Sequence, residues 1–431
     1  MGDRLTIVSV TPNALRSDSR TLKQAATLAR EGHRSIVVER FASGIDYSPF
    51  GIEVISLLSQ LPGTTPRAPL VRPAWWRFGS WLRNGILRWL YDLKMFADFR
   101  VKHWLDELWP AVRIIPRADL YILHSFHWLW PVRLRCALHR VPYIYDAHDF
   151  YSEMTNPKEV DRWTREWMLP FYARMDRAAL AHAAASMTVT NGCAELYEQK
   201  LGIRPLVVRN AHDARIDRAP TLTLRRRLGL APGDFVVVAV GNHKPGMRLD
   251  DVLLHAERLP AGVHIAFVGA GYENLGSVRD RAVSTGRVHF VPSVPAEIIV
   301  PLIADADAAL VLIHDYTANH RAALPNRFFQ AIAANLPVLH SGSVSEICSL
   351  DSRFRFGIAI ATDRIESISR GLVQLRGDPG LYRRLKEGAR TARDALSWAR
   401  EEVGFMELVS AVADGRAIKH LSPEEQGIRV Q

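Results

Sequence analysis

Residues 324–341 read LPNRFFQAIAANLPVLHS and are the most informative segment of the sequence. Its opening Leu-Pro-Asn predicts a turn that caps a helix, and the next residues are apolar at helical spacing: Phe328, Phe329, Ile332 and Ala333. An apolar run over residues 336–339 then predicts a buried strand. The segment therefore predicts a turn, a short helix, a tight connection and a strand.

The start of this helix is a candidate anion site. Unpaired backbone N–H groups and the positive end of the helix dipole suit a diphosphate. Arg327 lies in the first turn, where a positive charge is unfavourable for the helix unless an anion lies nearby. Taken alone, the segment is equally compatible with an exposed arginine beside an ordinary cap. Other segments of the chain are needed to choose between this and an anion site.

The segment resembles the donor-site helix of family-4 retaining glycosyltransferases, in the branch that reads LPN-(K/R)-x-F-E-x-x-A-x-G-x-P-V. Five other segments resemble the same family in the same order along the chain. They are Asp18-Ser19-Arg20 before a helix and Gly32-His33, then Tyr145-Asp146-Ala147-His148-Asp149, Val207-Val208-Arg209-Asn210-Ala211, Phe267-Val268-Gly269-Ala270-Gly271 and Val288-His289-Phe290.

Strand-like and helix-like segments alternate in both halves of the chain, which predicts an α/β protein with two parallel, doubly wound sheets. The resemblance implies the GT-B architecture, in which two Rossmann-like domains face a central cleft. We expect an acceptor-side domain over 1–212, a nucleotide-sugar domain over 213–397 and a linker within 211–222. A closing helix over 398–415 would return to the first domain, and the polar tail 416–431 is expected to be disordered.

Composition limits the compartment and the partners. The chain has 431 residues and is 48% hydrophobic, enough for two or three cored domains. Its three cysteines are too scattered for a disulfide framework or a zinc site, so a reducing cytoplasm is the expectation. We expect no signal peptide and no membrane-spanning segment. The net charge of +10 favours an anionic partner, but no nucleic-acid-binding module is recognisable, and simple solubility is the alternative explanation.

The region 66–110 is unusual in composition, because it holds six of the eleven tryptophans. Between residues 67 and 102, eight Arg and Lys residues are opposed only by Asp92 and Asp98. This pattern predicts a helical insertion that lies in an anionic lipid interface, on the inner face of the cell membrane. The alternative is a helical hairpin packed on the first sheet. The residues expected at the membrane are Trp75, Trp76, Arg77, Trp81, Arg83, Arg88 and Trp89.

The donor phosphates have a second candidate segment in residues 240–248, a loop between a strand and a helix. Gly241 lets the backbone approach a ligand closely, and Lys244 or Arg248 can neutralise a diphosphate leaving group. The family places two basic residues here, and the second aligns with either Met247 or Arg248; an exposed loop without function is the alternative. The predicted donor-binding residues are Gly241, Asn242, Pro325, Asn326, Arg327 and Gln330.

His148 is the main catalytic candidate of the first domain, with Lys244 and Arg248 as the others. Asp146 and His148 are two positions apart at a strand end and should point the same way. The resemblance places His148 against the transferred sugar and the donor phosphate. A metal site of Asp146, His148 and Asp149 is the alternative, although the resemblance implies metal-independent catalysis without a cofactor. Other predicted cleft residues are Asp18, Arg20, His124, His127, Asp146 and Asp149.

Two other motifs affect the functional prediction. Asp305 and Asp307 form a D-x-D pattern for which a capping or turn role is favoured over metal binding. The acidic pair of the family falls on Ala322 and Gln330, and a glutamine can still bond a ribose diol, but without charge assistance.

The sequence therefore predicts a retaining glycosyltransferase that uses a nucleotide-diphosphate sugar. Its acceptor would be a glycan or a lipid-linked molecule in surface polysaccharide or glycolipid biosynthesis. A weak or inactive homologue that binds glycan or nucleotide within a biosynthetic complex is the alternative. A nucleotide-sugar epimerase is a distant third, since it would need cleft carboxylates that the sequence does not provide.

Overall fold

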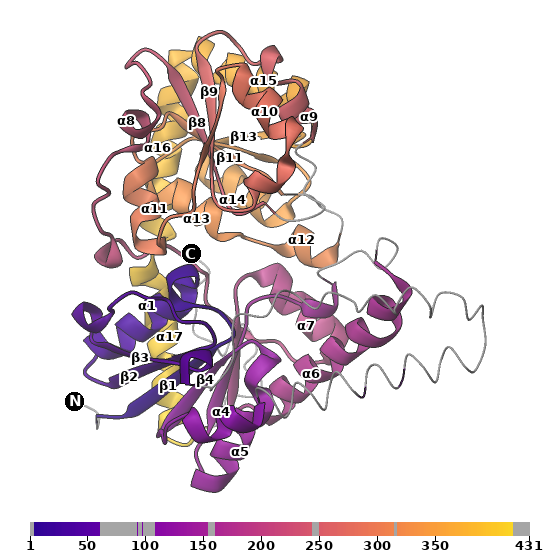
Figure 1. The fold of residues 1–431 in the computed structure, drawn as a ribbon. Coiled ribbons are helices and arrows are strands. Elements are labelled where there is room, and N and C mark those ends of the chain that lie inside the picture. Colours follow the sequence, from indigo (N-terminus) through magenta and orange to yellow (C-terminus); the bar gives the residue numbers. More distant parts are fainter. Residues whose placement is uncertain are drawn as a thin grey trace. The chain divides into compact units, whose positions relative to one another are not determined.

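A computed structural model describes residues 4–60, 108–153, 160–243, 250–313 and 317–416, together with Leu93 and Ala97. The chain divides into two compact units, one of Met1–Met187 with Leu408–Gln431 and the other of Thr188–Glu407 (Figure 1). The domain limits expected at residues 212 and 397 stay predictions. Most of the predicted 66–110 insertion and the tail from residue 417 lie outside the described residues.

The first sheet has seven strands in the order β3-β2-β1-β4-β5-β6-β7. Its pairings among β3, β2, β1, β4 and β5 are parallel. Apolar runs such as TIVSVT in β1 are buried along almost their whole length, as expected for parallel strands covered on both faces. The strands are β1 (Thr6–Thr11), β2 (Arg34–Glu39), β3 (Ile52–Ser56), β4 (Leu120–His124), β5 (Tyr143–Ala147), β6 (Ala185–Thr188) and β7 (Leu206–Val207).

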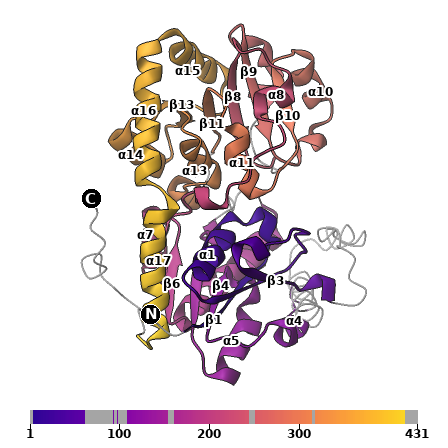
Figure 2. The same ribbon diagram turned by 90° about the vertical axis from the view of Figure 1, so that its left-hand side faces the viewer.

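Helices along this part of the chain cover the first sheet and connect its strands. Helix α1 is amphipathic, packs on β2 and begins at the cap residue Asp18, whose side chain accepts a hydrogen bond from the Thr21 N–H. Helix α4 packs against α5 (Figure 2). The helices are α1 (Ser19–Arg30), α4 (Trp109–Ile114), α5 (Leu129–His139), α6 (Leu169–His182) and α7 (Asn191–Leu201).

The second sheet has six parallel strands in the order β10-β9-β8-β11-β12-β13. Alternate residues of β8 enter two different buried clusters, one containing Val236 and Val238 and the other containing Val237 and Ala239. Both faces of this sheet are therefore covered, as a doubly wound fold requires. The strands are β8 (Phe235–Val240), β9 (Val263–Val268), β10 (Val288–Val291), β11 (Ala308–Val311), β12 (Val338–Ser341) and β13 (Gly357–Ile360).

The helices of the second half complete this layered arrangement (Figure 2). Helix α13 packs against α16 and contributes Phe328 and Ile332 to one core cluster. The helices are α8 (Leu224–Leu228), α9 (Asp250–Leu254), α10 (Ser277–Ser284), α11 (Ala296–Ile303), α12 (Ala318–Ala322), α13 (Asn326–Ala333), α14 (Ser345–Phe354), α15 (Ile365–Gly377) and α16 (Pro379–Ala395). The last helix, α17 (Trp398–Ala413), begins in the second unit, and its residues from Leu408 on belong to the first.

The prediction of two doubly wound α/β sheets is confirmed, and the fold is the GT-B arrangement of two Rossmann-like domains. Strands β3, β7 and β13 were not predicted, because they are short or only partly buried and their apolar pattern is weak. No helix among the described residues has both the length and the apolar composition that a membrane span requires.

Each sheet has one point where the strand order reverses. In the first sheet it lies between β1 and β4, and in the second between β8 and β11. Ligands of open α/β sheets bind beyond the carboxyl ends of the strands at such points. These two edges are therefore where functional side chains are expected.

Candidate active site

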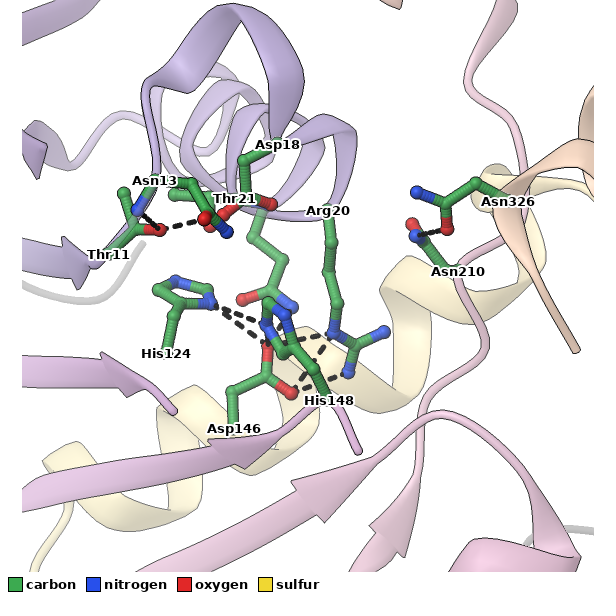
Figure 3. A network of polar contacts seen from close by, with 11 residues as sticks. Thr11, Asn13, Asp18, Arg20, Thr21, His124, Asp146, His148, Asn210 and Asn326 are labelled. Atoms are coloured by element: carbon green, nitrogen blue, oxygen red, sulfur yellow. Dashed lines mark hydrogen bonds and ion pairs between the residues drawn. The ribbon is translucent and has the colours of Figure 1, made fainter. Parts of the chain in front are cut away.

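A buried polar cluster occupies the carboxyl edge of the first sheet (Figure 3). His124 ends β4 and is the register partner of Asp146 on β5, so the two side chains are held next to each other. His148 follows β5 directly and points back toward the same carboxylate. The cluster thus lies beside the point where the strand order of this sheet reverses.

Asp146 is the centre of this cluster. Arg20 Nε lies 2.8 Å from its Oδ2 and Arg20 Nη2 lies 2.8 Å from its Oδ1, a bidentate ion pair between two buried side chains. Gln24 Nε2 donates a further hydrogen bond of 2.8 Å to Oδ2. Such a pair stabilises the fold only while both partners remain, because removing one leaves an uncompensated buried charge.

The two histidines complete the cluster. His124 Nδ1 lies 3.1 Å and His148 Nε2 lies 3.3 Å from Asp146 Oδ2, and the two ring nitrogens are 3.2 Å apart. His124 is fully buried, whereas His148 keeps part of its side chain exposed. Of the two rings, His148 is therefore the one that is accessible from solvent.

Burial and charge together set the ionisation of these groups. Burial alone would raise the pKa of Asp146, but Arg20 and His148 hold it well below its usual value. Burial would lower the pKa of His148, but Asp146 and Asp18 outweigh it and raise the pKa above the usual value. Burial lowers the pKa of His124, so this ring is the one that stays neutral.

Asp18 belongs to the same neighbourhood without bonding to Asp146. Its carboxylate caps α1 and accepts a hydrogen bond of 2.7 Å from the Thr11 hydroxyl. Burial would raise its pKa, but the nearby His148 and His124 lower it. Asp18 therefore adds a fixed negative charge that favours a proton on His148.

His124, Asp146 and His148 are also the described residues whose ligand atoms come close enough to share a metal ion. The donor set fits a cation poorly, because Oδ2 of Asp146 already accepts from Arg20 and Gln24. Arg20 also neutralises the negative charge of Asp146, which a metal cation would need for binding. Asp149 is outside this set, so the alternative site of Asp146, His148 and Asp149 is not what the structure assembles.

The structure places His127 and Asp149 apart from the cluster. His127 Nδ1 lies 2.6 Å from the Ser125 hydroxyl, and its ring stacks on Phe126 with centroids 4.8 Å apart. Burial raises the pKa values of Tyr151 and Asp176, and the nearby charge of Asp149 raises them further. Neither residue belongs to the group of His124, Asp146 and His148 whose ligand atoms converge.

A second candidate site lies at the carboxyl edge of the second sheet, where β8 and β9 end. Gly241 has φ of 137°, which favours glycine, and its carbonyl accepts a hydrogen bond of 2.9 Å from the Tyr272 hydroxyl. Asn242 Oδ1 accepts from the Ala270 N–H at 2.9 Å. A Cβ on Gly269 would lie 2.2 Å from the Gly241 carbonyl oxygen, so glycine is required for the two loops to meet.

Arg327 reaches this glycine loop from the first turn of α13. A Cβ on Gly241 would lie 3.2 Å from Arg327 Nη1, so the guanidinium rests on the glycine backbone. Burial lowers the pKa of Arg327, and no carboxylate pairs with it among the described residues. A guanidinium in this position is an unsatisfied cation beside a helix N-terminus, which is a favourable site for an anion.

The other predicted donor residues lie on the same helix. Pro325 is the N-cap of α13 and provides no side-chain cap. The Phe328 N–H donates to the Pro325 carbonyl at 2.9 Å, which leaves the two preceding N–H groups of the first turn for a ligand. The Asn326 side chain accepts a hydrogen bond from Asn210 Nδ2 (Figure 3). Gln330 is partly buried in the second turn.

The structure constrains position 322, where the resemblance places the first glutamate of the family. Ala322 ends α12, its carbonyl accepts a hydrogen bond of 2.8 Å from the Thr190 hydroxyl, and its Cβ would be 2.9 Å from a Cβ on Gly192. The start of α7 therefore packs directly against Ala322, which leaves little room there for a glutamate.

Several predicted residues lie outside the described part of the chain. They are Lys244, Met247 and Arg248 of the donor loop and Trp75, Trp76, Arg77, Trp81, Arg83, Arg88 and Trp89 of the expected membrane segment. The D-x-D motif is structural, as expected: Asp307 Oδ2 accepts from the Val236 N–H at 2.7 Å, and Asp305 Oδ2 accepts from the Arg225 N–H at 3.2 Å.

Sequence reasoning missed three contributors. Gln24 lies four residues after Arg20 and hence on the same side of α1, a spacing that could have identified it. Tyr272 follows the predicted Gly269–Gly271 turn without a recognisable signal. A pocket of 440 Å³ beyond β11, β12 and β13 was also not expected; Ser341, Ser343, Thr362 and Asp363 are among its lining residues.

Residues 18–211 match the family described as "Glycosyl transferase 4-like domain". This segment carries Asp18, Arg20, His124, Asp146 and His148, which are the residues of the first cluster. No curated protein matches the chain in sequence.

Solved structures with this fold cover nearly the whole chain. Sucrose-phosphate synthase from Thermosynechococcus elongatus has a TM-score of 0.66 at 13% identity and covers 96% of this chain and 100% of its own. HepE from Anabaena, in complex with UDP-glucose, has a TM-score of 0.64 at 14% identity, with 95% and 100% covered. WaaG, a glycosyltransferase involved in lipopolysaccharide biosynthesis, has a TM-score of 0.58 at 15% identity, with 92% and 99% covered.

Proposed function

We propose that this protein is a retaining, metal-independent family-4 glycosyltransferase that uses a nucleotide-diphosphate sugar. The observation that carries the proposal is the Arg327 guanidinium, held against Gly241 without a carboxylate partner among the described residues. The match of residues 18–211 to a glycosyltransferase domain and the GT-B fold support it. UDP-glucose bound to HepE supports a nucleotide sugar as the donor.

In the proposed reaction, the second unit binds the diphosphate of the donor. Arg327 and the N–H groups that follow Pro325 stabilise the negative charge that develops as the diphosphate leaves. Lys244 and Arg248 would add further positive charge; both lie outside the described residues. The acceptor hydroxyl attacks from the same face, and the departing phosphate oxygen takes its proton.

The first unit contributes His148. Its part-exposed ring is fixed by Asp146 and His124, so it can hydrogen-bond a sugar with little loss of side-chain freedom. The proposal requires that His148 reaches the transferred sugar during turnover. Its interaction is then expected to strengthen in the transition state.

For the acceptor we propose a membrane-associated or glycan molecule, as in assembly of surface polysaccharide or glycolipid. The likeness in fold to WaaG, whose role is lipopolysaccharide biosynthesis, is compatible with this class. Binding of the inner membrane face through Trp75, Trp76, Arg77, Trp81, Arg83, Arg88 and Trp89 remains a prediction from the sequence.

The rival function is a catalytically weak homologue that binds nucleotide or glycan as a subunit of a complex. The packing of Ala322 against Gly192 favours this rival. The glutamate of the family is absent at position 322, and Gly192 lies where its side chain would need room. Gln330 in place of a glutamate points the same way, although an amide still bonds a diol.

One experiment separates the two functions. The purified protein is incubated with UDP-, GDP- and ADP-sugars and with a glycan or lipid-linked acceptor, and free nucleoside diphosphate is measured. Release above the level of a His148→Ala control supports the enzyme. Binding of nucleotide without release in any combination supports the binding subunit. If the protein neither binds nor releases a nucleotide, both functions are refuted.

A further inference from the structure

Helix α5 is apolar on its outer side as well as on its inner side. Leu129 and Val132 face the core and are fully buried. On the outer side, Trp130, Leu134 and Leu138 are 45%, 39% and 62% exposed. These three residues are four positions apart, so they form one stripe along the helix. A surface helix of a globular domain is normally polar on that side.

Arginines flank this stripe. The Arg133 guanidinium lies 5.2 Å from the centre of the Trp130 ring. On the neighbouring helix α4, Arg113 lies 5.8 Å from the ring of Trp109, which is also exposed. Aromatic rings with arginines over them combine an apolar body with a cationic rim, a combination suited to a boundary between water and lipid.

The charge of the region is almost entirely positive. Residues 108–140 contain five arginines and one acidic residue, Asp119, which accepts a hydrogen bond of 2.7 Å from the Thr6 N–H. No ion pair joins any of these arginines to a carboxylate among the described residues. The pKa of His139 is lowered by desolvation and then by the charges of Arg135 and Arg117, which shows that positive charge converges at this end of α5.

We infer that the α4–α5 surface, formed by Trp109, Arg113, Trp130, Arg133, Leu134 and Leu138, binds the surface of an anionic lipid bilayer. The apolar side chains enter the boundary between headgroups and acyl chains, and the arginines meet lipid phosphates. This inference deepens the proposed function and rests on its membrane-associated acceptor, since it names the surface that brings the protein to that acceptor. None of its residues belongs to the segment Trp75–Trp89 that the sequence predicts at the membrane.

The test is flotation of the full-length protein with vesicles, which needs no turnover. Vesicles of phosphatidylcholine with phosphatidylglycerol are compared with vesicles of phosphatidylcholine alone. The wild-type protein is expected to float with the anionic vesicles only, and less at high salt, because salt screens exposed charges. Equal flotation with both kinds of vesicle, or with neither, would overturn the inference.

Two variants locate the contact. Leu134→Glu with Leu138→Glu is expected to lower the bound fraction roughly tenfold or more, because it places charge in the apolar stripe. The matched control is Leu222→Glu with Val373→Glu, which changes leucine and valine side chains that are 48% and 57% exposed in the other unit and should leave binding unchanged. All variants should melt at the wild-type temperature, since these positions are exposed.

A second pair tests the charge. Arg113→Gln with Arg133→Gln is expected to weaken binding roughly tenfold, whereas Arg226→Gln with Arg227→Gln on α8 should have no effect. If the α5 double variant floats like the wild type, the α4–α5 surface is not the contact. If the wild-type protein instead forms a dimer that the α5 variant abolishes, and does not float, a second copy covers the stripe and the lipid inference is wrong.

The two experiments fail independently. If the wild-type protein releases nucleotide in the donor panel but binds no vesicles, the surface is refuted and the glycosyltransferase is kept. Vesicle binding without nucleotide release would keep the surface and favour the binding-subunit alternative.

Discussion

His124 Nδ1 lies 3.2 Å from His148 Nε2, and both nitrogens face the same carboxylate oxygen of Asp146. The Asp146 carboxylate can accept a hydrogen bond from His148 Nε2 and from His124 Nδ1. A neutral His148 therefore carries its proton on Nε2 and leaves Nδ1 as an acceptor. No hydrogen bond of Nδ1 occurs within the described part of the chain, so this acceptor is available to a substrate hydroxyl.

The first prediction concerns His124 as a positioning residue. His124→Ala removes one interaction with Asp146, so the carboxylate should act more strongly on His148 and raise its pKa further. Asp18 also raises that pKa, while burial and Arg20 oppose the increase. If neutral His148 is the active form, the acid limb of the kcat profile should move to higher pH in this variant.

His124→Asn is the matched control for that change, because its amide can again donate to Asp146 from near the Nδ1 position. It should restore the wild-type profile. A purely structural role of His124 would lower the melting temperature of both variants and leave the acid limb in place.

The second prediction concerns His148 itself. His148→Ala should lower kcat at least about tenfold, or about 1.4 kcal/mol in the barrier, because its hydrogen bond strengthens in the transition state. Nucleotide affinity and melting temperature should stay nearly unchanged. His33→Ala is a suitable control, since His33 accepts a hydrogen bond from the Leu5 N–H before β1 begins. Near-normal turnover of the His148 variant would remove the catalytic assignment.

Local pattern was enough to predict much of the fold and part of the first cluster. Period two along a strand predicted that Asp146 and His148 share a side, and the structure brings them within 3.3 Å. The ion pair of Arg20 with Asp146 was not predicted, because it joins α1 to β5 and depends on how the helix packs on the sheet. The register that sets His124 opposite Asp146 is likewise a property of strand pairing.

In the second sheet, too, local features could be predicted from the sequence and tertiary contacts could not. Glycines after β8 and β9 predicted turns, but only their packing reveals that Gly269 must be small for the Gly241 loop to fit. Ala322 was interpreted from the family pattern as a missing glutamate. Its close contact with Gly192 is a tertiary feature that a single sequence does not contain.

The third prediction is that the second unit binds a nucleoside diphosphate through Arg327. Arg327→Ala should weaken binding by ~1–3 kcal/mol, the scale of a charge-assisted bond, and Arg327→Lys should recover part of it, because a lysine keeps the charge but loses the planar fork. Calorimetry with UDP, GDP and ADP measures the effect, with Arg353→Ala as a control. No binding of any nucleotide at millimolar concentration would refute the donor site.

Glycine variants of the same loop provide a fourth test. Gly241→Ala places a methyl group 3.2 Å from the Arg327 guanidinium at a φ of 137°, so it should displace the arginine and weaken nucleotide binding. Gly233→Ala is the matched control, because nothing lies within 4 Å of its Cβ position and its φ is not positive. Unchanged affinity of the Gly241 variant would show that the loop does not face the nucleotide.

The last prediction concerns stability and Asp176, a fully buried residue of α6. The Tyr145 hydroxyl donates to its Oδ1 at 2.5 Å, and burial raises its pKa from the usual 3.8 to about 7. The folded chain thus holds this proton more tightly than the unfolded chain. The contribution of this proton to the free energy of unfolding is complete below the pKa of Asp176 in the unfolded chain. It falls by about 1.4 kcal/mol per pH unit between the unfolded and folded pKa values, and it is constant above the folded pKa.

Asp176→Asn keeps an acceptor for Tyr145 and removes the ionisation. The variant should therefore melt at a higher temperature than the wild type at about pH 8, and its advantage should shrink toward about pH 5. Asp280→Asn, at an exposed position of α10, should leave the pH dependence unchanged. Parallel melting curves of wild type and Asp176→Asn across this range would mean that Asp176 has an ordinary pKa in the folded protein, and that its burial beside Tyr145 is compensated by other groups.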